Sequence, residues 1–137
     1  RRLLGKRKLE VKLPQTVITA EMDGRLIVQV LVNLLENAVK HSPDGSVITV
    51  GCLAEDDDVK FYVADCGDGI DPSVRNRLFE QYVTLDRGIT DSSHGIGLGL
   101  SICKAIIDAH GGNIYASDNH PCGAVFTFTI PGKQAEI

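Results

Sequence analysis

The chain has 137 residues, enough for one domain whose apolar core needs no disulfide or metal to hold it together. Apolar residues make up 43% of it, as in ordinary soluble globular proteins, and a formal net charge of −4 argues against general nucleic-acid binding. No apolar run approaches the roughly 18 residues that a membrane-spanning helix needs.

The first eight residues are strongly basic, and the chain starts without Met. A membrane-surface or nucleic-acid-binding arm is one interpretation, but the exposed end of a linker from a preceding domain explains the pattern more simply. We therefore predict a linker end at residues 1–8, one domain at 9–133 and a tail at 134–137. The four cysteines form no C-x-x-C pair, which predicts reduced thiols in a cytoplasmic protein.

The chain alternates between strand and helix patterns. Period-two alternation and turn signals predict six strands, at residues 9–13, 17–20, 46–53, 59–65, 113–117 and 124–130. Helical periodicity predicts a helix from an Asp23 N-cap to about residue 40, a short helix at 72–79 and a helix at 98–109. This order predicts an α/β (α+β) two-layer sandwich, with a mixed, mostly antiparallel sheet and helices on one face.

Polar side chains follow one flank of the first predicted helix. Asn33, Asn37 and Lys40 share a stripe roughly 100° from the centre of its apolar face. An amide oxygen suits Mg²⁺, and an ammonium suits a phosphate oxygen. The alternative is an ordinary solvent-facing surface with two indifferent Asn residues.

A carboxylate ends the fourth predicted strand. Asp65 shares a face with apolar Val59, Phe61 and Val63, so it points toward the interior and needs a donor. The amino group of adenine would supply one, while the alternative is a carboxylate that caps its own glycine-rich turn.

Three alternate glycines, Gly95, Gly97 and Gly99, precede the last predicted helix. Glycines at this spacing leave backbone N–H groups free to wrap an anion, and a helix N-terminus attracts negative charge. We therefore predict a phosphate-binding loop that opens a helix, preceded by a polar lid at residues 85–94; a flexible linker is the alternative.

Together these segments resemble the ATP-binding catalytic domain of sensor histidine kinases, within the superfamily of gyrase B, Hsp90 and MutL. The resemblance runs from Leu9 to about Pro131 and implies the Bergerat-type ATP-binding fold. Four segments carry it: 33–40, 65–70, 78–80 and 95–100. The stretch from 102 to 126 looks most like the Kdp-type, potassium-responsive sensor kinases.

The resemblance implies a role for each matching position. Asn37 would ligate Mg²⁺ with Asn33 assisting, Lys40 would contact phosphate, and Asp65 would accept from adenine. The remaining positions would line the base pocket, anchor the lid or cradle the phosphates: His41, Gly67, Gly69, Ile70 and Gly123 around the base, Phe79 at the lid, and Gly95, Gly97, Leu98, Gly99 and Leu100 at the phosphates. The sequence departs from the family at Thr84, where many members carry Arg, at Ala124, which replaces Ser or Thr, and at His41, which replaces Tyr.

The resemblance also separates transfer from hydrolysis. Hydrolysing relatives place a Glu at the position of Asn33, and an amide cannot act as a general base. The chain is therefore expected to bind ATP and Mg²⁺ and to donate the γ-phosphoryl group to a histidine. None of His41, His94, His110 and His120 precedes an acidic residue on a helical stretch, so we expect the acceptor in a separate N-terminal dimerisation domain.

The same resemblance implies the setting of the chain. We expect the cytoplasmic domain of a membrane-anchored, homodimeric sensor in a two-component system, with a response regulator downstream and no nucleic-acid partner. The chain alone is expected to be a monomer. Two alternatives stay open: an ATP hydrolase of the same superfamily, and a non-catalytic nucleotide-binding module that regulates a partner.

Overall fold

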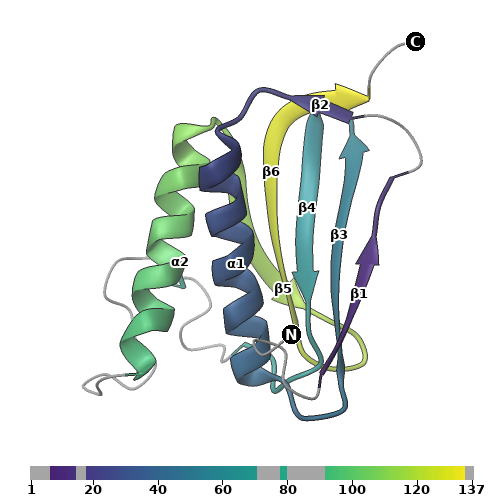
Figure 1. The fold of residues 1–137 in the computed structure, drawn as a ribbon, viewed down its shortest axis with the longest axis vertical. Coiled ribbons are helices and arrows are strands. Elements are labelled where there is room, and N and C mark those ends of the chain that lie inside the picture. Colours follow the sequence, from purple (N-terminus) through teal and green to yellow (C-terminus); the bar gives the residue numbers. More distant parts are fainter. Residues whose placement is uncertain (1–6, 15–17, 71–77, 80–91, 135–137) are drawn as a thin grey trace.

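The structure is a computed structural model that describes residues 7–14, 18–70, 78–79 and 92–134. It has two layers, with two helices side by side against one face of a sheet (Figure 1). The elements are β1 (Lys8–Lys12), β2 (Ile18–Ala20), α1 (Gly24–His41), β3 (Val47–Glu55), β4 (Asp58–Ala64), α2 (Ser92–Ala109), β5 (Asn113–Asp118) and β6 (Ala124–Gln134). The predicted two-layer α/β sandwich is confirmed.

The sheet has six strands in the order β1-β3-β4-β6-β2, with β5 also paired to β6. Only β1 and β3 run parallel among these strand pairs, and the others are antiparallel, as predicted. The pairing of β4 with β6 places Ala64 opposite Val125. This register brings the loop after β4 beside the loop that precedes β6, although the two loops are far apart in sequence.

The helix α1 forms where the sequence predicts it. The carboxylate of Asp23 accepts hydrogen bonds from the backbone N–H groups of Arg25 and Leu26, and so caps two of the donors that a helix N-terminus leaves unpaired. The side chains that face the sheet are fully or nearly fully buried in the core: Ile27, Val30, Leu34 and Ala38.

The core lies between the helices and the sheet. Phe61 and Phe128 stack from neighbouring strands with 4.8 Å between ring centroids. The largest fully buried side chains come from both layers, namely Phe128, Leu34, Ile48, Ile107, Ile130, Val30, Val59, Val63 and Cys103. The predicted inward face of β4 is therefore confirmed at Val59 and Val63.

Two element boundaries differ from the prediction by more than two residues. The strand β6 continues past Pro131 because its last residues pair with β2, where Gly132 lies opposite Ala20. The helix α2 begins at Ser92 rather than near Leu98, so the three alternate glycines lie inside it. Of the predicted short helix at 72–79, only Leu78 and Phe79 are described, as a turn. Most of the predicted lid also lies outside the described residues.

No helix in the described part of the chain is long and apolar enough to cross a membrane.

Replacing Asp23 with Ala should destabilise the domain by about 1 kcal/mol, because two N–H groups at the start of α1 lose their acceptor. Urea denaturation followed by circular dichroism measures the loss. Glu21→Ala is the matched control, since it removes a carboxylate from an exposed residue just before the cap. Equal stability of the two variants would contradict the capping role.

Candidate functional site

Asp65 stands at the centre of the candidate site, directly after β4, and is 3% exposed. Its Oδ1 accepts hydrogen bonds from the backbone N–H groups of Gly67, at 2.8 Å, and Ala124, at 3.3 Å. The structure therefore supports part of the alternative interpretation, since the carboxylate does cap its own turn. Among the described residues, no donor reaches Oδ2. Every fully buried polar side-chain atom in this part of the chain has a hydrogen-bond partner, so Oδ2 is not fully buried and reaches the surface.

The loop between β5 and β6 holds the backbone of Asp65 from the other side. The side-chain amide of Asn119 donates to the carbonyl oxygen of Asp65 at 2.7 Å, and the backbone N–H of Asp65 donates to Ala124 at 2.9 Å. Gly123 lies so close that an added Cβ would be 2.0 Å from the same carbonyl oxygen, and its φ is +93°. Only glycine fits this contact without displacing the backbone.

Gly67 makes a second close contact, with the end of α1. A Cβ at this position would lie 1.9 Å from the carbonyl oxygen of His41. The C-terminal turn of α1 and the loop after Asp65 therefore touch through their backbones. This contact brings the Asn37–His41 segment and Asp65 into one site, as the sequence predicts.

Asn37 is 8% exposed on α1, and among the described residues its side-chain amide has no hydrogen-bond partner. Burying an amide without a partner costs free energy, so a nearly buried amide that still reaches the surface is suited to a ligand. Lys40 lies one turn further along and is exposed. An amide oxygen and an ammonium on this flank fit a metal-bound phosphate, although no group of three His, Cys, Asp or Glu residues gathers in the described part.

Asn33 lies against α2 rather than in open solvent. Its side-chain carbon is 3.8 Å from the position of a Cβ added to Gly99. Burial raises the pKa of the Cys103 thiol to about 11, and a hydrogen bond with Asn33 opposes that shift. Asn33 therefore faces α2, which the sequence did not predict.

The three glycines do not form a loop in this structure. Gly95, Gly97 and Gly99 are helical residues of α2, together with Leu98 and Leu100. Beyond the first turn of a helix, N–H groups bond to carbonyl groups four residues earlier, so in this conformation they cannot wrap a phosphate. The expectation rested on the poor helix propensity of glycine, about 1 kcal/mol per residue less favourable than that of alanine, and the structure has a helix at these positions instead. A phosphate role for these residues stays a prediction that requires another backbone conformation.

Several predicted pocket residues are packed against the core. Leu100 is 3% exposed, and Ile70 is partly buried against the same cluster. Phe79 makes an edge-to-face contact with Phe126, with 6.2 Å between centroids. Gly69 has a φ of +83°, which favours glycine in this turn. Thr84, where the sequence departs from the family, and the nearby Arg87 lie outside the described residues.

The prediction of four reduced thiols is wrong for two of the cysteines. Cys66 and Cys122 form a disulfide, with 4.9 Å between their Cα atoms, and Cys52 and Cys103 are free. The absence of C-x-x-C excluded only a local pair, whereas the β4–β6 pairing brings together loops 56 residues apart. The cysteines therefore give no support to a cytoplasmic location.

Sequence reasoning missed Asn119, the disulfide and the contacts of Arg7 described below. The cysteines did carry a signal, since Cys66 follows Asp65 and Cys122 precedes Gly123, two positions already assigned to the pocket. Asn119 carried none, because an Asn in a polar turn is ordinary.

The chain is similar to known proteins over most of its length. Residues 22–134 match the family described as histidine kinase-, DNA gyrase B-, and HSP90-like ATPase. The chain is 45% identical over 124 residues to the sensor protein KdpD of Clostridium acetobutylicum, covering 90% of this chain but only 14% of that protein.

Two solved structures are similar over most of the chain. The catalytic domain of the histidine kinase ThkA in a nucleotide-free form has a TM-score of 0.78 and 30% identity, covering 92% of this chain and 80% of that one. Full-length ShkA in complex with AMPPNP has a TM-score of 0.79 and 30% identity, covering 96% of this chain and 27% of that one.

The cysteine chemistry predicts a stepwise thiol count. In the native protein only the half-buried Cys52 should react with a maleimide at pH 7.5, because Cys103 is fully buried and burial raises its pKa to about 11. Burial also raises the pKa of the Cys52 thiol, so its labelling should be slow. Unfolding without reductant should release two reactive thiols, and unfolding with reductant should release four. Intact mass after labelling gives the counts, and four labels without reductant would contradict the disulfide.

Proposed function

Because this chain belongs to the family of histidine kinase-, DNA gyrase B- and HSP90-like ATPases, we propose that it binds ATP and donates its γ-phosphoryl group to a histidine on a separate acceptor domain. The chain spans 14% of the length of the KdpD relative, so the acceptor and the remaining machinery belong to other parts of such a protein.

The observation that carries this proposal is the state of the Asp65 carboxylate. Backbone N–H groups of Gly67 and Ala124 fix Oδ1, and Oδ2 reaches the surface without a donor from the described residues. A carboxylate oxygen held in this way accepts a hydrogen bond from the exocyclic amine of adenine. It would repel the carbonyl oxygen that guanine carries at the same position, so the site favours adenine nucleotides.

The phosphate end of the nucleotide would lie along α1. Asn37 offers an amide oxygen that can hold Mg²⁺, and Lys40 can contact a phosphate oxygen. Bound Mg²⁺ supplies neutralising charge on the phosphates, which is the main demand of phosphoryl transfer besides positioning. The AMPPNP complex of ShkA supports ATP as the nucleotide, since AMPPNP is an analogue of ATP.

Asn33 favours transfer over hydrolysis. It occupies the position where hydrolysing relatives carry Glu, and its amide cannot take a proton from water. Its contacts with Gly99 and Cys103 also engage the side chain with α2. The kinase interpretation is therefore preferred over a hydrolase, and the metal-suited amide of Asn37 argues against a non-catalytic nucleotide-binding module.

The setting follows from the relatives alone. We infer a sensor kinase of a two-component system, with the acceptor histidine on a dimerisation domain and a response regulator downstream. From the similarity to KdpD we also propose a membrane-anchored homodimer that has this domain in the cytoplasm and responds to potassium.

Asp65→Asn should weaken the binding of Mg-ATP by about 10- to 150-fold, which corresponds to the loss of a hydrogen bond to a charged group. The new amide can still accept from Gly67 and Ala124 through its oxygen, so the fold should persist, but its NH₂ would face the adenine amine donor to donor. Isothermal titration calorimetry measures the affinity. Asp68→Asn is the matched control, because it removes the same charge from an exposed residue of the same turn.

An unchanged affinity of Asp65→Asn at an unchanged melting temperature would contradict the assignment of the base pocket.

The isolated chain should not phosphorylate itself. None of its four histidines stands in an acceptor context, so incubation with [γ-³²P]ATP should leave no acid-labile label on the protein. Transfer to an added acceptor domain at μM concentration should be roughly 10² to 10³ slower than in a tethered protein, where the effective concentration is near mM. Sustained phosphate release without an acceptor would instead favour the hydrolase.

A further inference from the structure

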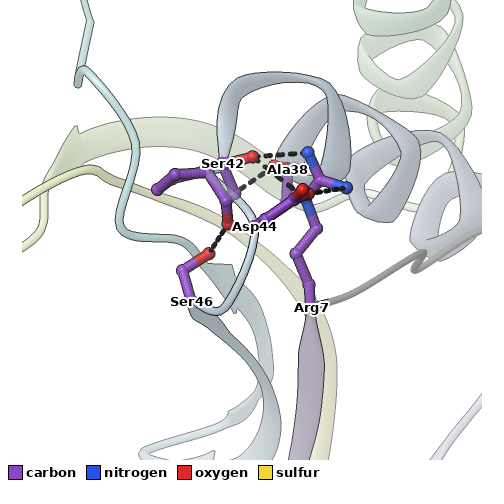
Figure 2. A network of polar contacts seen from close by, with 6 residues as sticks. Arg7, Ala38, Ser42, Asp44 and Ser46 are labelled. Carbon is purple, nitrogen blue, oxygen red and sulfur yellow. Dashed lines mark hydrogen bonds and ion pairs between the residues drawn. The ribbon is translucent and has the colours of Figure 1, made fainter.

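Arg7 reaches across from the start of β1 to the end of α1 (Figure 2). Its Nε and Nη2 both donate to the carbonyl oxygen of Ser42, at 2.9 and 2.6 Å. Its Nη1 lies 3.6 Å from Oδ1 of Asp44. The Arg7 side chain is 19% exposed, so these contacts are largely shielded from water. The backbone N–H of Lys8 also donates to Ser46, which fixes the start of β1 along the same turn.

The acceptor of these bonds belongs to the capping turn of α1. The Ser42 hydroxyl donates to the carbonyl oxygen of Ala38, and its N–H donates to that of Val39 (Figure 2 shows the first of these bonds). Ser42 therefore satisfies two carbonyl groups that the helix end would leave unpaired, and Arg7 satisfies the carbonyl of Ser42 itself. A cation is favourable here, because the C-terminus of a helix carries partial negative charge.

The other side of the same turn contacts the base pocket. The carbonyl oxygen of His41, adjacent to Ser42, would be 1.9 Å from a Cβ on Gly67. The N–H of Gly67 donates to Oδ1 of Asp65. The last turn of α1 is thus held between the guanidinium of Arg7 and the loop that orients the Asp65 carboxylate.

From this arrangement we propose that Arg7 is a positioning residue for the nucleotide site. It holds the wall that carries Asn37 and Lys40 in register with the wall that carries Asp65. Arg7 does not touch the nucleotide and acts through Ser42. This role rests on the proposed ATP-binding function. Through Arg7, the start of β1 would set the distance between the adenine and phosphate parts of the pocket.

The geometry of the contact requires a guanidinium. Two of its N–H groups converge on one carbonyl oxygen, which an ammonium on a flexible stem cannot reproduce. The ion pair with Asp44 contributes little by comparison, because the Asp44 side chain is 67% exposed. The bonds to the Ser42 carbonyl are therefore the part of the network that positions the turn.

The first test compares two ligands. Arg7→Gln should weaken Mg-ATP, which needs both walls, by about five- to tenfold, a coupling of the size seen between contacting residues. It should change the affinity for adenosine, which needs only the Asp65 wall, by less than about twofold. Titration calorimetry with each ligand gives the ratio. Lys8→Gln, which removes the same charge from an exposed neighbour, and Asp44→Asn should both bind like the parent chain.

Arg7→Lys should fall between Arg7→Gln and the parent chain, since it restores the charge but only one point of contact. A general loss of folding would lower both affinities in proportion and would overturn the positioning role. Unchanged Mg-ATP binding by Arg7→Gln would overturn it as well.

The second test needs no nucleotide. Hydrogen exchange followed by NMR should show faster exchange in Arg7→Gln at the Ser42 amide, which bonds to Val39, and little change at the Gly67 amide, which bonds to Asp65. Neither amide should change in Lys8→Gln. If the Ser42 amide keeps the exchange rate of the parent chain, the inference is wrong whatever the affinities. If the parent chain fails to bind Mg-ATP, the proposed function fails, and the exchange rates still decide whether Arg7 positions the turn.

Discussion

The site depends on a buried carboxylate that is held by backbone groups. Asp65 lies at the end of a central strand, where an ionised group is tolerable only if donors surround it. Two N–H groups from separate segments meet one of its oxygens, and the side chain of Asn119 holds its carbonyl group. Because the backbone around Asp65 is fixed, its second oxygen is left at the surface, where we propose that it accepts a hydrogen bond from adenine.

Close backbone contacts allow three segments to converge at this point. The end of α1 touches the loop after β4 at Gly67, and the loop before β6 touches it at Gly123. A side chain at either glycine would push the segments apart, since each added Cβ would lie about 2 Å from a carbonyl oxygen. The Cys66–Cys122 disulfide joins two of these segments covalently, beside the same carboxylate.

Patterns within one segment predicted most of the fold and part of the site. Helical periodicity and the Asp23 cap predicted α1, and strand alternation predicted that Asp65 points inward. Both patterns depend only on neighbours in the sequence. The disulfide and the Asn119 contact could not be read in this way, since β4–β6 register creates them. The predicted start of α2 was wrong because glycine spacing alone does not determine whether these residues form a loop or a helix.

The two walls of the pocket are stabilised in different ways, and this difference bears on function. The Asp65 wall is tied down by strand pairing, by Asn119 and by a disulfide. The α1 wall is fixed at its end by a cap, by Arg7 and by one backbone contact with Gly67. The Asp65 wall, which we propose to bind adenine, therefore has more fixed contacts, and under the role proposed for Arg7 small changes at the entry of β1 would act mainly on the position of Asn37 and Lys40. A change that reaches the domain through β1 would thus alter the geometry of the phosphates before it altered recognition of the base.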